Sequence, residues 1–247
     1  MPETNLLYIT LYSGLAGVLG TGGGGLLAYY WSRPSRKNFS MVLGFAAGIM
    51  LVIIFMELIP ESLELVSSPL LIIGLVLGIG VFLQLDLLLP HYHPATGEDG
   101  RHTRYLNKGY LIASGIALHN LPEGLAIGAG FAASPSLGFG LALIIAIHNV
   151  PEGLALAMPF NAAGRRGTGL WISVVTGLAM GLGGFIGGLV GNVSPLLLGI
   201  SLAFAAGAML YIVCDELIPD AYDTSPDHSP IIGIVAGVVL GLIFVSL

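Results

Sequence analysis

The chain has 247 residues, of which 55% are hydrophobic and only 9% are charged. This composition excludes an ordinary soluble domain and is typical of a protein that crosses a membrane several times. The net charge is −6, but the positions of the charged residues are more informative than their sum.

The hydrophobic residues fall into eight apolar segments, each long enough to cross a bilayer as a helix, although the eighth is short. We therefore predict an all-α polytopic membrane protein with eight transmembrane helices, forming one transmembrane domain over residues 1–247. The segments run approximately over Leu6–Tyr30, Ser40–Pro60, Pro69–Leu89, Tyr105–Phe131, Leu137–Pro159, Thr168–Val190, Pro195–Pro219 and Pro230–Leu247.

The basic residues predict how the chain is oriented in the membrane. All of them lie in alternate connections or, as Lys108 does, open the segment that follows one, and short connections rich in Lys and Arg are cytoplasmic. Both termini then lie outside the cytoplasm, and the first segment is a spanning helix rather than a cleaved signal peptide. We expect the protein in the cell (plasma) membrane, surrounded by lipid. The basic residues are Arg33, Arg36, Lys37, Arg101, Arg104, Lys108, Arg165 and Arg166.

The fourth and fifth segments carry the same motif, His-Asn-x-Pro-Glu-Gly, within their apolar runs. Its His and Glu are four residues apart and share one face of a helix, with the Asn beside them. Its Pro cannot donate a backbone hydrogen bond, so the helix is expected to be interrupted there. Ionisable side chains inside a membrane are costly and usually functional. We predict that they bind a cation through His119, Asn120, Glu123, His148, Asn149 and Glu152.

A second repeat relates segments two and seven. Segment two contains Phe-Ala-Ala-Gly-Ile-Met before Glu57-Leu-Ile-Pro60, and segment seven contains Phe-Ala-Ala-Gly-Ala-Met before Glu216-Leu-Ile-Pro219. The two segments cross in opposite directions, as do segments four and five. This pattern predicts an inverted repeat in which helices 1–3 and 6–8 surround the central antiparallel pair 4/5, as in transporters with a site at the membrane midplane.

The repeat places one glutamate towards each mouth of a path through the centre. Glu57 lies towards the outer end of segment two, and Glu216 lies towards the inner end of segment seven. Two interpretations remain open for them. They line the path, or each simply extends its carboxylate to the membrane surface from a helix end.

The ligand types indicate which cations suit the centre. Imidazole with carboxylate is typical of Zn²⁺, Fe²⁺, Mn²⁺ and Co²⁺, whereas Ca²⁺ and Mg²⁺ prefer oxygen alone. The one cysteine, Cys214, lies far from the motifs in an apolar run, where we expect it to be buried. The carboxylates of Glu123 and Glu152 balance one divalent cation, and its binding should displace protons. We expect no catalytic cofactor and no nucleic-acid partner.

The two His-Asn-x-Pro-Glu-Gly motifs resemble those of the ZIP (Zrt/Irt-like) divalent-metal transporters, and the resemblance extends over nearly the whole chain. It implies import of zinc, and of iron, manganese, cobalt or cadmium, into the cytoplasm by alternating access. It also implies that Met50 approaches the central site, that Asp86, Asp215 and Glu216 line the exit, and that the protein forms a homodimer. Core packing is an equal alternative for Met50.

The resemblance also bears on a cytoplasmic loop and on a departure from the family pattern. The loop at about 90–104 contains His91, His93 and His102, which either capture metal or belong to a solvated segment. In segment six, Met180 stands where many family members have a glutamate that helps to hold a second metal. Without that charge, we expect a single ion at the centre.

Two other functions would fit a metal site in a membrane. An intramembrane metal-dependent hydrolase would need an open water position and a base, as His-Glu-x-x-His supplies, and an inverted duplication has no use in it. A membrane protein that binds metal without transporting it would bind the ion but show no uptake. We expect a transporter and not an enzyme.

Overall fold

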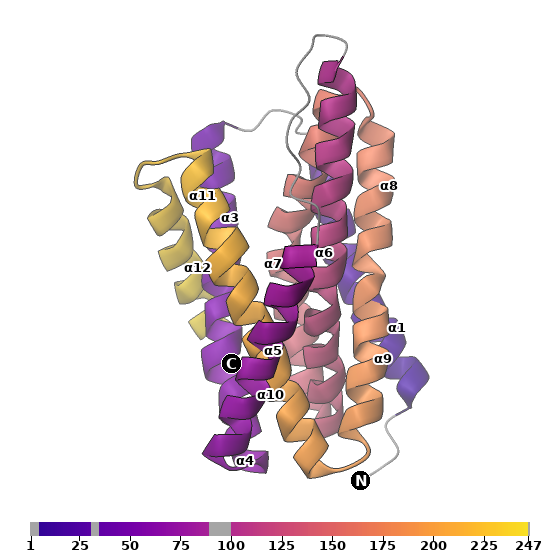
Figure 1. Ribbon diagram of the computed structural model, residues 1–247, viewed down its shortest axis with the longest axis vertical. Coiled ribbons are helices and arrows are strands. Elements are labelled where there is room, and N and C mark those ends of the chain that lie inside the picture. The colour runs from indigo at the N-terminus through magenta and orange to yellow at the C-terminus, as the bar shows by residue number, and fades with distance from the viewer. Residues whose placement is uncertain (1–4, 31–34, 89–99, 247) are drawn as a thin grey trace.

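The computed structural model describes residues 5–30, 35–88 and 100–246, and every regular element in those ranges is helical. The helices stand side by side along one long axis (Figure 1). Three short segments, named η, are π-helical turns. The elements are α1 (Leu6–Gly17), η1 (Val18–Gly22), α2 (Gly23–Tyr30), α3 (Arg36–Val52), η2 (Ile53–Leu58), α4 (Ile59–Leu65), α5 (Ser68–Leu88), α6 (Gly100–Ala133), α7 (Pro135–Ala162), α8 (Arg166–Gly177), α9 (Ala179–Gly191), α10 (Pro195–Ile212), η3 (Val213–Leu217), α11 (Ile218–Thr224) and α12 (Ser229–Val245).

Within the described residues, six helical stretches are long and apolar enough to cross a membrane. α6, which carries the first polar motif, has 34 residues, and α12 is an apolar helix of 17 residues. The prediction of an all-α, polytopic membrane protein is thus confirmed. The six stretches are Leu6–Tyr30, Arg36–Leu65, Ser68–Leu85, Pro135–Ala162, Arg166–Gly191 and Pro195–Thr224.

The helices pack as two bundles. The site bundle contains residues 6–30, 100–162 and 166–191, in which α6 packs against α7 and α9, α1 against α9, and α2 against α7. The flanking bundle contains residues 36–88 and 195–245, in which α3 packs along α12 and α5 along α10. The bundles meet where α10 contacts α6 and where α3 contacts α7.

Glycines allow the helices within each bundle to approach backbone to backbone. A Cβ added to Gly237 of α12 would overlap the carbonyl oxygen of Phe45 in α3. One added to Gly187 of α9 would likewise overlap that of Leu125 in α6. Small residues four apart on a helix face permit this close packing in lipid, where van der Waals contact drives association. The glycines therefore bring the helices of each bundle into direct backbone contact.

The two Glu-Leu-Ile-Pro sequences adopt the same local structure. η2 ends just before Pro60, and η3 ends just before Pro219. Each proline lacks the N–H that an α-helix would use, and a wider π-helical turn accommodates the loss. Glu57 and Glu216 both lie in these turns. Cys214 is exposed in η3 because Val213 and Leu217 take the buried side, so the expected burial of the cysteine is wrong.

The motif prolines do not interrupt their helices, contrary to expectation. α6 continues through Pro122, and α7 continues through Pro151. A proline removes one donor, while close neighbours hold the helix on its path: a Cβ on Gly124 would overlap the Met180 carbonyl. The break lies instead in the neighbouring helix, where a turn at Leu178 separates α8 from α9.

Polar contacts join α3 to α11 and α12 at one end of the flanking bundle. The Ser40 hydroxyl donates to the Ala221 carbonyl over 2.7 Å, and Lys37 Nζ lies 3.3 Å from Asp227 Oδ2. The backbone N–H of Ser229 donates to Asp227 Oδ1 over 2.9 Å. This backbone hydrogen bond is the main reason why the pKa of Asp227 lies well below its ordinary value.

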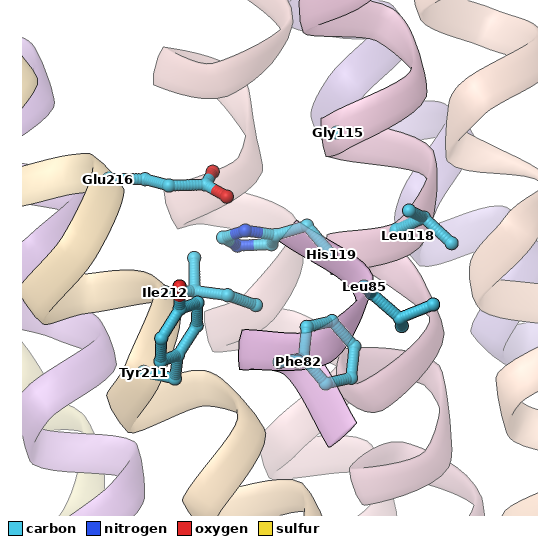
Figure 2. A pocket seen from close by; sticks show the side chains of 8 residues that line it. All are labelled: Phe82, Leu85, Gly115, Leu118, His119, Tyr211, Ile212 and Glu216. Carbon is cyan, nitrogen blue, oxygen red and sulfur yellow. The ribbon is translucent and has the colours of Figure 1, made fainter. Parts of the chain in front are cut away.

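A small cavity of about 20 Å³ lies where the two bundles meet. That volume is about the space one water molecule needs. Figure 2 shows the Glu216 carboxylate and the His119 ring directed into the same space, one from each bundle. The cavity is lined by Phe82, Leu85, Gly115, Leu118, His119, Tyr211, Ile212 and Glu216.

Candidate metal centre

The centre of the site bundle gathers the ionisable residues of both motifs. α6 supplies His119 and Glu123, and α7 supplies His148 and Glu152. Because each His and Glu are four apart, one helical face presents both side chains. One ligand atom from each of the four residues lies within 4.8 Å of the others, and all four residues are buried. Sequence spacing showed only that the His and Glu of each motif share a helix face. The structure brings the two pairs together into one group.

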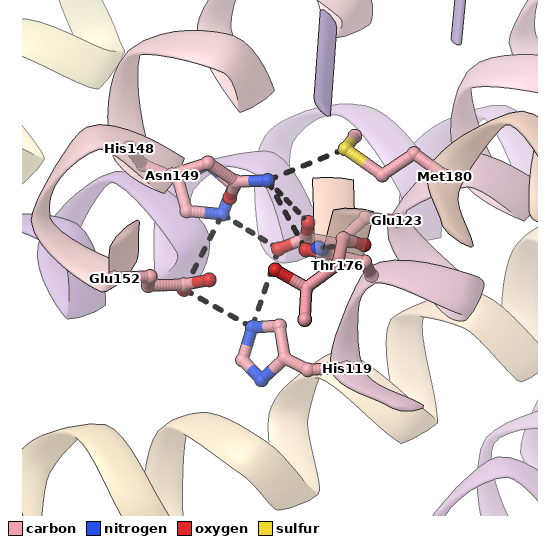
Figure 3. Close-up of polar contacts among 8 residues, drawn as sticks. His119, Glu123, His148, Asn149, Glu152, Thr176 and Met180 are labelled. Carbon is pink, nitrogen blue, oxygen red and sulfur yellow. Dashed lines mark hydrogen bonds and ion pairs between the residues drawn. The ribbon is translucent and has the colours of Figure 1, made fainter. Parts of the chain in front are cut away.

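The four side chains contact one another through the atoms that ligate metals (Figure 3). Glu123 Oε1 lies 2.7 Å from His148 Nε2 and 3.2 Å from His119 Nε2. Glu152 Oε1 lies 3.1 Å from His119 Nε2 and 3.9 Å from His148 Nε2. Two imidazole nitrogens and two carboxylate oxygens thus surround one position. Such a donor set suits a four-coordinate divalent transition metal, above all Zn²⁺.

The two carboxylates differ in their surroundings although their motifs match. Neither oxygen of Glu152 accepts a hydrogen bond among the described residues, and Oε1 has only its ion-pair contacts with the two histidines. Glu123 Oε2, by contrast, accepts a hydrogen bond of 2.8 Å from Asn149 Nδ2. A buried carboxylate with no donor is costly unless a cation approaches it. These residues therefore fit a cation that is bound next to the Glu152 oxygens, which accept no hydrogen bond.

The two asparagines of the motifs form a chain of hydrogen bonds behind Glu123. Asn120 Nδ2 donates to the Thr176 carbonyl over 2.9 Å, and Asn149 Nδ2 lies 3.3 Å from Asn120 Oδ1. Asn149 Nδ2 also lies 3.3 Å from Met180 Sδ. Sequence reasoning missed Thr176, because it takes part through a backbone carbonyl that no side-chain pattern reveals.

Comparison with known proteins bears on what this cluster is. The family described as ZIP Zinc transporter matches residues 95–247, which include both motifs. Proteins described as Zinc transporter ZupT from Salmonella paratyphi A, Salmonella newport and Salmonella heidelberg are each 37% identical to this chain over 251 residues. The alignments cover 98% of this chain and 96% of each relative. The chain belongs to the ZIP family.

The structure places the other residues that the sequence singled out in this ZIP chain as follows. Met50 is fully buried in α3, in the central apolar cluster that also contains Met180. Its approach to a cation stays a prediction. Glu216 is half-buried beside His119, Asp215 is exposed next to it, and Glu57 is half-buried in η2. His91 and His93 lie outside the described residues, as do the side chains of Asp86 and His102.

Proposed function

We propose that this protein transports divalent transition-metal cations, with Zn²⁺ as the principal cargo, into the cytoplasm through the His/Glu centre. The observation that supports it best is the convergence of His119, Glu123, His148 and Glu152 within 4.8 Å in the buried core. Membership of the ZIP family supports transport over hydrolysis. The two carboxylates neutralise one divalent cation, so a single ion at the centre is the favoured occupancy.

The transmembrane arrangement belongs to the same proposal. α6 and α12 complete eight crossings, and the chain forms one domain with both termini outside the cytoplasm of a plasma-membrane protein. The distribution of basic residues supports this orientation. Matching π-helical turns at Glu57 and Glu216 support the inverted repeat, since α4 and α11 lie at opposite ends of the molecule (Figure 1). A homodimer in the lipid bilayer completes the proposed assembly.

The two-bundle architecture supports alternating access. The cavity shared by His119 and Glu216 lies between the bundles, so a shift of one bundle against the other would open or close it. Glu216 and Asp215 would then receive the ion on its way to the cytoplasm, with Asp86 near the same end. Glu57, at the other end, would meet it on entry.

Purified protein in liposomes tests the transport function. Wild-type protein should carry Zn²⁺ into liposomes that contain a trapped chelator. Glu152→Ala should abolish this uptake when equal amounts of the two proteins are incorporated. The matched control is Gly140→Ala, because a Cβ at Gly140 meets nothing within 4 Å. Zn²⁺ binding without uptake by the wild-type protein would refute transport. Release of amines from peptide or amide substrates would indicate a hydrolase instead.

Cysteine labelling tests the proposed orientation. Cys214 must first be replaced, because it is exposed. An impermeant thiol reagent should then label Glu57→Cys from outside the cell and Glu216→Cys from the cytoplasmic side. Labelling of both positions from one side would contradict the inverted arrangement.

A further inference from the structure

We propose that Asn149 is a positioning residue: its amide nitrogen holds Glu123 Oε2, so that only Oε1 faces the cation and the far side of this carboxylate is closed to a second ion. The inference rests on the proposed metal centre and revises the expected role of the asparagines as oxygen ligands. It assigns the two asparagines different tasks: Asn120 orients Asn149, and Asn149 holds Glu123. The His and Glu side chains of both copies face the cation.

The orientation of the Asn149 amide follows from its three neighbours. Its Nδ2 lies 2.8 Å from Glu123 Oε2, 3.3 Å from Asn120 Oδ1 and 3.3 Å from Met180 Sδ. All three atoms are acceptors, so the amide nitrogen with its two N–H donors fits this position and an oxygen would be repelled. In the opposite orientation, Asn149 Oδ1 would face the carboxylate.

Asn120 is in turn oriented by the neighbouring helix. Its Nδ2 donates to the Thr176 carbonyl over 2.9 Å, close to the break between α8 and α9. The amide therefore points its oxygen at Asn149. Asn120 and Asn149 are both fully buried, so water does not compete for these bonds. A backbone carbonyl of one helix thus determines, through two amides, which oxygen of Glu123 is free.

The consequence for the cation follows from the distances around Glu123. Its Oε1 lies within 3.2 Å of both imidazole Nε2 atoms, whereas Oε2 is engaged by the 2.8 Å bond from Asn149. A second cation beyond Oε2 would have to occupy the position of an N–H donor. That position offers amide and thioether groups but no further carboxylate to balance its charge. Occupancy by one ion then depends on Asn149 as well as on the number of carboxylates.

Counting bound Cd²⁺ and Zn²⁺ per chain in detergent-purified protein at about pH 8 tests the inference. Wild type should hold one ion. Asn149→Asp replaces the donor by a carboxylate facing Glu123 Oε2 and should hold two. Asn149→Leu frees the Glu123 side chain and should still hold one ion, with affinity lower by about 10- to 100-fold, the usual effect of losing a group that orients a metal ligand.

Asn161→Asp is the matched control. Asn161 lies nine residues after Glu152 on α7, about 13 Å along the helix, and its amide donates to the Ala28 carbonyl over 2.7 Å. This variant should hold one ion with wild-type affinity. It shows whether a second ion requires the new carboxylate at position 149 or only an added negative charge on α7.

Three results would overturn the inference: two ions in wild type, one ion in Asn149→Asp, or unchanged affinity in Asn149→Leu. If Asn149→Asp does not give a homogeneous protein, the wild-type count and the Asn149→Leu affinity still decide. Failure of the transport proposal is separate, since it would appear as an absence of Zn²⁺ uptake by the wild-type protein in liposomes whatever these counts show.

Discussion

Replacing Glu123 and Glu152 in turn by alanine should have unequal effects on the stability of the metal-free protein, although the two residues hold the same place in the two motifs. Glu123→Ala removes the acceptor of Asn149 Nδ2 at 2.8 Å and the partner of His148 Nε2 at 2.7 Å. It also removes the weaker 3.2 Å contact with His119. Glu152→Ala removes one contact of similar length, the 3.1 Å approach to His119 Nε2.

The magnitude follows from the number of bonds. A hydrogen bond to a charged, buried group contributes about 1.5–3 kcal/mol. Two short bonds are lost in Glu123→Ala, and one longer contact is lost in Glu152→Ala. Glu123→Ala should therefore be less stable by about 1.5–3 kcal/mol than Glu152→Ala, because it loses one more short hydrogen bond to a buried carboxylate. Neither residue is exposed by more than 2%, so solvent does not screen the difference.

Thermal unfolding in detergent with a chelator present measures this difference, with Zn²⁺ uptake in liposomes as the second assay. Both variants should lose uptake, because each leaves the cation with one uncompensated positive charge in a dry centre. The Glu123→Ala midpoint should lie several degrees below that of Glu152→Ala. Equal midpoints, or the reverse order, would show that the contacts of Glu123 do not stabilise the empty centre. Near-normal uptake by either variant would remove that residue from the ligand set.

Further expectations concern packing and pH. Gly153→Ala should reduce stability by about 1–3 kcal/mol, since its Cβ would overlap the Thr21 carbonyl, whereas Gly140→Ala should not; equal expression and melting of the two would contradict the close packing. Asp227→Ala should lower the melting midpoint at about pH 5 as much as at neutral pH. Because the pKa of Asp227 is depressed in the fold, its contribution is complete above the ordinary carboxyl pKa and is lost as the pH falls from there through the lowered value. Zn²⁺ binding should release protons into a weakly buffered solution and weaken as the pH falls, because only neutral imidazoles ligate the metal; pH-independent affinity would exclude the histidines as ligands.

The sequence by itself determined the membrane class and pointed to the four residues that the structure brings together at the centre. Long apolar segments have few stable forms in lipid other than helices, so their positions could be read directly. His119 and Glu123 share a face in any helix, because a spacing of four residues is a property of the helix itself. The glycines four apart in α9 and α12 are likewise visible in the sequence, and they permit close contact because no side chain intervenes.

Only the tertiary structure decided how the two motifs differ. Distances between helices depend on packing, and no spacing along one helix encodes that Glu123 meets both imidazoles or that the Thr176 carbonyl orients Asn120. The same holds for the backbone at prolines: Pro122 stays within a continuous helix beside its closely packed neighbours, whereas π-helical turns precede Pro60 and Pro219. Identical residues therefore reach different environments because α6 and α7 have different neighbours, and the sequence repeat alone cannot express that asymmetry.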